Sequence, residues 1–300
     1  MVFVCARFYD LINCETANAI RSRGRGASWK DPPTHADSLP PSRGRAEAPA
    51  PARGWSSIAE DQLATPTSSP DRVAFLAGIS KDCRGCDLRE AKLKRRDLSG
   101  ADLTGADLTG AVLHRAKLGN ATLDHAKLQD ANLNKADLKR ASLTGADLTG
   151  ALLYGTDLSG AQLDGAIMTQ VHMAHGRLTR AVLRGADLSL STIMDAEMAG
   201  CDLSHANLMR SNLNGANLSR CDLTAAVLDG AGFVRARVKD AKLQGVSARQ
   251  TDFYEADLSG SDLTNGDFRG SRLQQADLDD AITDGIKTKG ALLVDGTIGQ

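Results

Sequence analysis

The chain has 300 residues, with 36 Lys+Arg against 37 Asp+Glu and only 4% aromatic residues. A net charge of −1 excludes a global electrostatic attraction to nucleic acid or to an acidic membrane surface, and no apolar run reaches the roughly 18 residues that a membrane span needs. Residues 1–20 lack the basic start of a signal peptide. Six scattered cysteines do not form the disulfide framework of a small secreted domain. We therefore expect a cytoplasmic protein.

Residues 1–68 differ in composition from the rest of the chain. They hold most of the prolines, separated by Arg, Ser, Ala and Gly, and show no apolar periodicity. Such a segment cannot bury enough apolar surface to offset the entropy of ordering it, so we predict a disordered tail. Next, Ser69 suits a helix N-cap, Pro70 the first helical position and Gly78 a helix end. Residues 69–87 are thus predicted to form a short capping helix and an incoming strand.

From residue 88 onward the sequence repeats with a period of five. Every fifth residue from Leu88 to Leu278 is Leu, Ile, Met, Val or Phe, except Ala248. Two positions earlier, the residues from Cys86 to Ala276 are Ala, Gly, Ser, Thr, Cys or Val, except Arg96. Nothing is inserted or deleted over the whole stretch.

A period of five fits neither an α-helix nor a straight strand. Five residues advance a helix by about 140° per step, so the large residues would circle it. On a strand, an odd step sends successive residues to opposite faces. The pattern requires a corner every five residues, with the large and the small residue pointing inward. Four corners close a coil of about 20 residues, and coils stack at the spacing of paired strands, about 4.8 Å. Residues 88–280 should form a rod of about ten coils.

Two segments carry a resemblance to a known family. DLSGADLTGADLTGAVL (97–113) and SHANLMRSNLNGANLSRCDL (204–223) resemble the pentapeptide-repeat family, whose motif is A(D/N)LxX. The resemblance implies an all-β fold, a right-handed quadrilateral parallel β-helix. Residues 281–300 carry Asp295-Gly296 between apolar flanks, a hairpin signature, and many chains of the family end in a similar hairpin. We expect Leu292, Leu293 and Ile298 to cover the last coil as a C-terminal cap.

Four cysteines and two irregular positions lie in inward slots. The Cys-x-x-Cys spacing of Cys83 and Cys86 is compatible with a metal or redox site. No second cysteine or histidine pair completes the four ligands of a zinc site, however. The resemblance implies that the two thiols are packed structural groups. Cys201 and Cys221 lie one coil apart and are expected to be free, buried thiols.

Arg96 and Ala248 break the size pattern. Val246 and Ala248 exchange the small and large slots, which conserves volume. A buried arginine is costly unless its charge escapes. Because Arg96 lies in the first coil, we predict that it leaves through the open end or pairs with an acid such as Asp71 or Asp82.

No catalytic constellation is present. The sequence contains no phosphate loop, no nucleophile elbow and no HExxH motif, and Asp residues before the large apolar positions suit turns. We expect no enzyme, no cofactor and no metal.

One side of the rod departs from the Asp pattern. The 20-residue recurrence places a group of apolar, aromatic and histidine side chains on the side centred on Leu93, Leu113 and their successors to Leu273. As the candidate protein-binding face we select Leu152, Tyr154, His172, His175, Met194 and Tyr254. Its first coils are basic, through Lys92, Lys94, Arg95, Arg115 and Lys135. An exposed apolar and aromatic strip is typical of a protein-binding surface, although outward positions that drift freely would give the same pattern.

Two functions from different classes fit these observations. The first is a non-enzymatic scaffold that binds an unidentified protein partner, with no direct contact to nucleic acid. The alternative is implied by the family: some members are DNA mimics that modulate DNA gyrase or topoisomerase IV. That activity needs a strongly acidic surface, whereas residues 82–280 carry 24 Lys+Arg and 27 Asp+Glu. The sequence therefore favours the scaffold.

Overall fold

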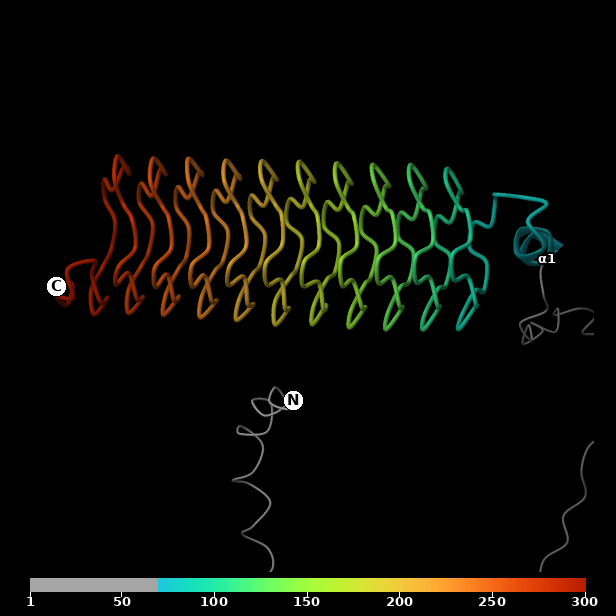
Figure 1. Ribbon diagram of the computed structural model, residues 1–300, viewed down its shortest axis with the longest axis horizontal. Helices are drawn as coiled ribbons and strands as arrows, with labels where there is room; N and C mark the ends of the chain where they lie inside the picture. The colour runs from blue at the N-terminus through green and yellow to red at the C-terminus, as the bar shows by residue number, and fades with distance from the viewer. Residues whose placement is uncertain (1–69) are drawn as a thin grey trace, which may run out of the picture. The chain divides into compact units, whose positions relative to one another are not determined.

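The computed structural model describes residues 70–300 (Figure 1). The predicted tail, 1–68, lies outside the described residues. A single α-helix, α1 (Pro70–Ala77), precedes the repeats, and Gly78 follows it with a φ of 77°. Among residues 70–300, no helix is long and apolar enough to cross a membrane.

Stacked coils with four sides form the rest of the described chain. From Asp82 to Leu292, a parallel β-bridge joins every fifth residue to the residue 20 positions later. The bridges are isolated, because each side of a coil contributes a single bridge residue before the chain turns a corner. The coils lie side by side along one axis, from α1 at one end to the C-terminus at the other (Figure 1).

The interior contains one large and one small residue from each side. The large residues from Leu88 to Leu273 are all 3% exposed or less. Ala248 and Val246 are both buried, at 0% and 1%, so the exchange of sizes keeps both residues inside the coil. Burying one leucine is worth about 1.5–3 kcal/mol before the chain entropy is subtracted. The repetition of this gain from coil to coil holds the rod together.

The repeat Ala106–Gly110 shows why the motif has its composition. Leu108 donates its backbone N–H to the next coil, to Lys127 O at 2.7 Å, and Ala111 N–H closes the corner on Leu108 O at 2.9 Å. Gly110 has a φ of 65°, as the third residue of a type II turn requires. Thr109 N–H has no backbone acceptor and donates to Asp107 Oδ1 at 3.1 Å. An Asp or Asn before the large residue thus satisfies the one N–H that the coil leaves open.

The front end differs from the sequence expectation in two respects. Of the two outcomes predicted for Arg96, pairing with Asp71 or Asp82 is wrong, whereas the side chain does leave the first coil, toward α1. Its guanidinium instead donates to Leu76 O at 3.0 Å and Phe75 O at 3.3 Å, at the last turn of α1, where the end of a helix favours a cation. Phe75 O also accepts the backbone N–H of Gly78 at 2.9 Å.

The cysteine pair at this end is the second difference. Cys83 and Cys86 are bonded to each other as a disulfide and are both buried. They still occupy inward slots, but not as free thiols. By contrast, Cys201 and Cys221 are free and buried, with their Sγ atoms 2.7 Å apart. Burial raises the pKa of the Cys201 thiol, and the contact with Cys221 raises this pKa further.

The back end also differs from the expected boundary at residue 280. The ladder continues through Asp267↔Lys287 and Arg272↔Leu292, and only then does the chain reverse, with an antiparallel bridge from Leu292 to Ile298. Leu293 packs against the core. The expected cover by Ile298 is wrong, since this side chain is 70% exposed. A hairpin across one side of the last coil cannot also place Ile298 over its centre.

Candidate protein-binding face

The side of the rod selected from the sequence, here called the Tyr154 face, follows the buried positions at Leu93 and every twentieth residue after it. In most repeats an Asp or Asn accepts the backbone N–H two residues later, but position 152 is a leucine. The backbone N–H of Tyr154 instead donates to Asn134 Oδ1, in the preceding coil, at 2.8 Å. Position 152 therefore does not have to supply an acceptor and can display an apolar side chain.

An aromatic cluster forms around Tyr154. Its ring meets the His175 ring edge-on, with centroids 5.5 Å apart, and Lys135 Nζ lies 5.8 Å from the ring centroid, within reach of a cation–π attraction. Tyr154 and Leu152 are 47% and 37% exposed. The ring is held from two neighbouring coils and still faces solvent, which suits a preorganised contact surface.

The structure brings together five of the six selected residues. His172 is exposed and is bridged to Leu152, and Met194, half-buried, follows in the next coil. Tyr254 lies 100 residues beyond Tyr154, which is five coils or about 24 Å along the rod. Its ring is covered by the Arg272 guanidinium, 4.0 Å from the ring centroid. A hydrogen bond to Glu255 is the main reason why the pKa of its phenol is raised. Tyr254 is thus separate from the cluster.

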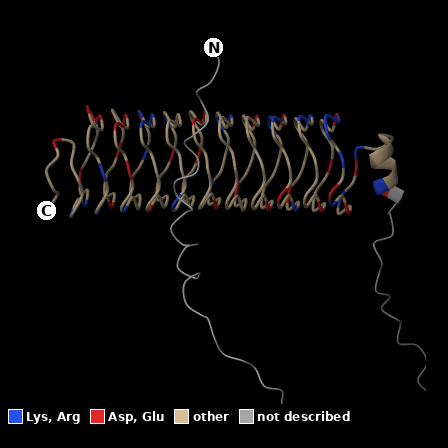
Figure 2. Ribbon diagram, turned by 60° about the horizontal axis from the view of Figure 1, so that its bottom comes forward, with Lys and Arg blue, Asp and Glu red and all other residues tan. Residues whose placement is uncertain are grey.

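The first coils of the Tyr154 face are basic. None of the five cations pairs with a carboxylate within residues 70–300: Lys92, Lys94, Arg95, Arg115 and Lys135. The pKa of His114, among them, lies below its usual value, first through partial desolvation and then through Arg115 and the nearby cations. Figure 2 shows basic segments close together along one edge of the coils next to α1. This end therefore offers unpaired positive charge to an acidic partner.

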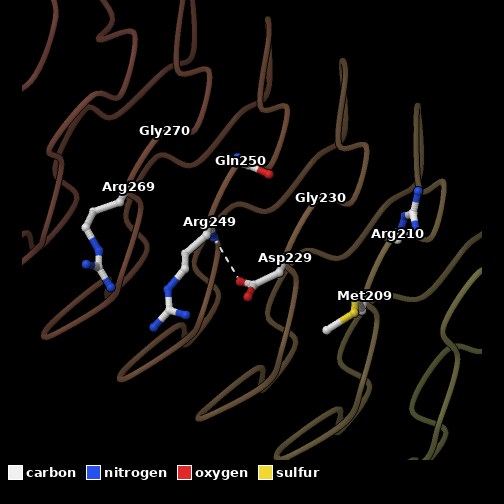
Figure 3. A pocket seen from close by; sticks show the side chains of 8 residues that line it. All are labelled: Met209, Arg210, Asp229, Gly230, Arg249, Gln250, Arg269 and Gly270. Carbon is white, nitrogen blue, oxygen red and sulfur yellow. Dashed lines mark hydrogen bonds between the residues drawn. The ribbon is translucent and has the colours of Figure 1, made fainter.

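The structure also shows a groove on a different side of the rod, which the sequence pattern did not predict. Four successive coils line it (Figure 3) with Met209, Arg210, Asp229, Gly230, Arg249, Gln250, Arg269 and Gly270. We call it the arginine groove. Gly230 and Gly270 line it without a side chain, and only the Cγ atoms of Arg210 and Gln250 lie near the positions that their Cβ atoms would take, each 3.5 Å away. The 20-residue recurrence, which places residues 209, 229, 249 and 269 in one column, was the signal that could have revealed it.

The described fold defines the chain as a four-sided parallel β-helix built from five-residue repeats. The family model for pentapeptide repeats matches it in 8 copies, over residues 82–120, 131–170, 177–208, 206–245, 233–270 and 251–282. The chain therefore belongs to the pentapeptide repeat family.

Solved structures of the same family resemble the chain. HetL, a pentapeptide repeat protein involved in heterocyst differentiation regulation in the cyanobacterium Nostoc sp. strain PCC 7120, is 31% identical, with a TM-score of 0.51, and the match covers 75% of this chain and 96% of HetL. QnrB1, a plasmid-mediated fluoroquinolone resistance protein, is 19% identical with a TM-score of 0.40, over 61% of this chain and 91% of QnrB1. A pentapeptide repeat protein from the Arabidopsis thaliana thylakoid lumen is 29% identical with a TM-score of 0.32, over 33% and 68%. No curated protein sequence matches the chain significantly.

Proposed function

We propose that the protein is a non-enzymatic scaffold that binds a protein partner through the part of the Tyr154 face around Leu152, Tyr154 and His175. The observation that carries this proposal is the exposed cluster of Leu152, Tyr154 and His175, held in place by Lys135. Exposed aromatic side chains on a rigid surface supply much of the energy of protein interfaces. The unpaired cations beside the cluster would fix the orientation of a partner that carries acidic residues.

A double variant tests this surface. Tyr154→Ser with His172→Asp removes the aromatic contact and adds a negative charge, while the buried residues are left intact. In a quantitative pull-down, partners of the wild-type chain should be lost from the variant. The matched control is Tyr254→Ser, on the same side but five coils away, which should retain them. Circular dichroism checks that both variants keep the fold. Equal capture by the double variant and the wild type would refute the proposed face.

The topoisomerase alternative has weaker support. A likeness at 19% identity shows the fold alone, and the Tyr154 face begins with five unpaired cations rather than with the acidic surface of a DNA mimic. A supercoiling assay with purified DNA gyrase separates the two functions. Inhibition of supercoiling at stoichiometric protein would favour the mimic over the scaffold.

A further inference from the structure

The arginine groove contains two guanidinium groups that are anchored on one buried carboxylate. Arg249 donates from Nε to Asp267 Oδ2 at 2.7 Å. Arg269 donates from Nε to Oδ1 at 2.8 Å and from Nη2 to Oδ2 at 2.7 Å. Asp267 is only 7% exposed, whereas the side chains of Arg249 and Arg269 are 52% and 48% exposed. The carboxylate therefore lies beneath the two arginines and fixes their orientation.

Both arginines keep donors that face solvent. Neither Nη of Arg249, nor Nη1 of Arg269, makes a hydrogen bond within residues 70–300. The carboxylate of Asp229 in the lining accepts on Oδ1 from Ser247 Oγ at 2.7 Å and from the backbone N–H of Arg249 at 3.0 Å (Figure 3), and it forms no ion pair with these guanidinium groups within residues 70–300. The free donors are thus available to a ligand.

The charge around the groove is positive. Its lining carries three arginines, and the carboxylates that face them are Asp229 and Asp267. Lys287 and Lys289, in the next coil on the same side, are exposed and form no ion pair within the described part of the chain. An oxyanion that enters the groove would meet oriented donors in a net positive field.

We propose that the arginine groove binds a phosphoryl group, either free or at the end of a larger ligand. Guanidinium forks donate parallel hydrogen bonds that match the oxygens of phosphate. Gly230 and Gly270, which also line the groove, add no side chain that would obstruct such a group. Arg249 and Arg269 are the binding residues, and Asp267 is a positioning residue that holds their donors toward the groove.

Inorganic pyrophosphate is the probe, titrated into the full chain by calorimetry at low ionic strength, where the binding of charged ligands is least screened. We expect saturable binding with a dissociation constant on the order of 1 mM or tighter. Arg249→Lys and Arg269→Lys keep the charge but lose the fork, and each should weaken binding about tenfold, or 1.4 kcal/mol. Arg184→Lys is the matched control. Arg184 also lies between two carboxylates, Asp164 and Asp202, on another side of the rod, and this variant should bind as the wild type does.

Asp267→Asn separates a built site from a simple patch of charge. This variant raises the net positive charge of the groove by one and releases both arginines. A positioning role predicts weaker binding of pyrophosphate, whereas a patch that acts by charge alone would bind it more tightly. Tighter binding by Asp267→Asn, lysine variants equal to the wild type, or no saturable binding would each overturn the proposal.

Two further titrations define the ligand class. A phosphoserine peptide that binds as well as pyrophosphate would identify a phosphoryl group carried by a protein as the source, and binding of pyrophosphate alone would identify a free ligand. Both results support the proposal. Equal binding of citrate would show that the groove does not select phosphoryl groups, and would contradict it.

Discussion

The corners of the coil give the sharpest prediction. Every fifth residue from Gly85 to Gly290 has a φ between 54° and 73°, a conformation that costs an L-residue about 1–2 kcal/mol but costs glycine little. Ala225 occupies such a corner with a φ of 57° and is exposed. Ala225→Gly removes this strain together with little buried apolar surface, and the greater freedom of glycine in the unfolded chain offsets about 0.4–1 kcal/mol of the gain. The variant should be more stable than the wild type by about 0.5–1 kcal/mol.

The matched control is a glycine corner in the same column, two coils earlier. Gly185 has a φ of 62°, and no atom lies within 4 Å of the position that a Cβ would take. Gly185→Ala therefore causes no clash, and only the backbone conformation changes the free energy. It should destabilise the protein by about 1 kcal/mol.

Urea unfolding followed by circular dichroism measures both effects. The two variants should shift the midpoint in opposite directions at an unchanged slope. If Ala225→Gly destabilised the protein as much as Gly185→Ala does, the left-handed corner would not be the source of the effect. A changed slope would instead indicate a change in the surface exposed on unfolding.

Three other predictions concern the ends and the groove. Arg96→Met removes both hydrogen bonds to the last turn of α1, at a cost of about 1–3 kcal/mol, and should speed amide exchange in α1; unchanged exchange would contradict this role. Deletion of residues 286–300 leaves Phe268 N–H and Leu273 N–H without their acceptors and should lower both the melting temperature and the solubility; a truncated chain that matched the full one would refute the cap. The hydrogen bonds from Arg269 are the main reason why the pKa of Asp267 lies well below its ordinary range. The ionised Asp267 therefore contributes fully to the free energy of unfolding above pH ~4, and this contribution is lost as the pH falls below that value. Asp267→Asn should flatten this part of an acid-unfolding profile, and an unchanged profile would show that the pair contributes nothing.

The internal design of the rod was predictable, because it depends on contacts that recur at a fixed spacing. The large residues were assigned to the interior from their period of five alone, and the structure confirms them at 3% exposure or less from Leu88 to Leu273. The Asp before each large residue was expected to serve the turn, and Asp107 does so by accepting Thr109 N–H. The cluster of Leu152, Tyr154 and His175 also followed from the 20-residue recurrence.

The ends of the rod were not predictable, because the repeat stops there. The partner of Arg96 depends on where α1 packs, and a helix of eight residues has no register in the five-residue period. Ile298 lay in an apolar flank of the hairpin, but the direction of the hairpin left it exposed. The pairing of Cys83 with Cys86 likewise required the conformation of the chain between them.

The sequence by itself determined the coil, its corners and the side on which each outward residue lies, since all three follow from steps of five and 20 residues. Only the tertiary structure decided which outward side chains interact. Arg249 and Arg269 lie in the same column of the sequence pattern, yet their anchoring on Asp267 depends on side-chain rotamers across neighbouring coils. Periodicity fixes where the backbone places a residue, whereas hydrogen bonds between coils fix the direction of its side chain.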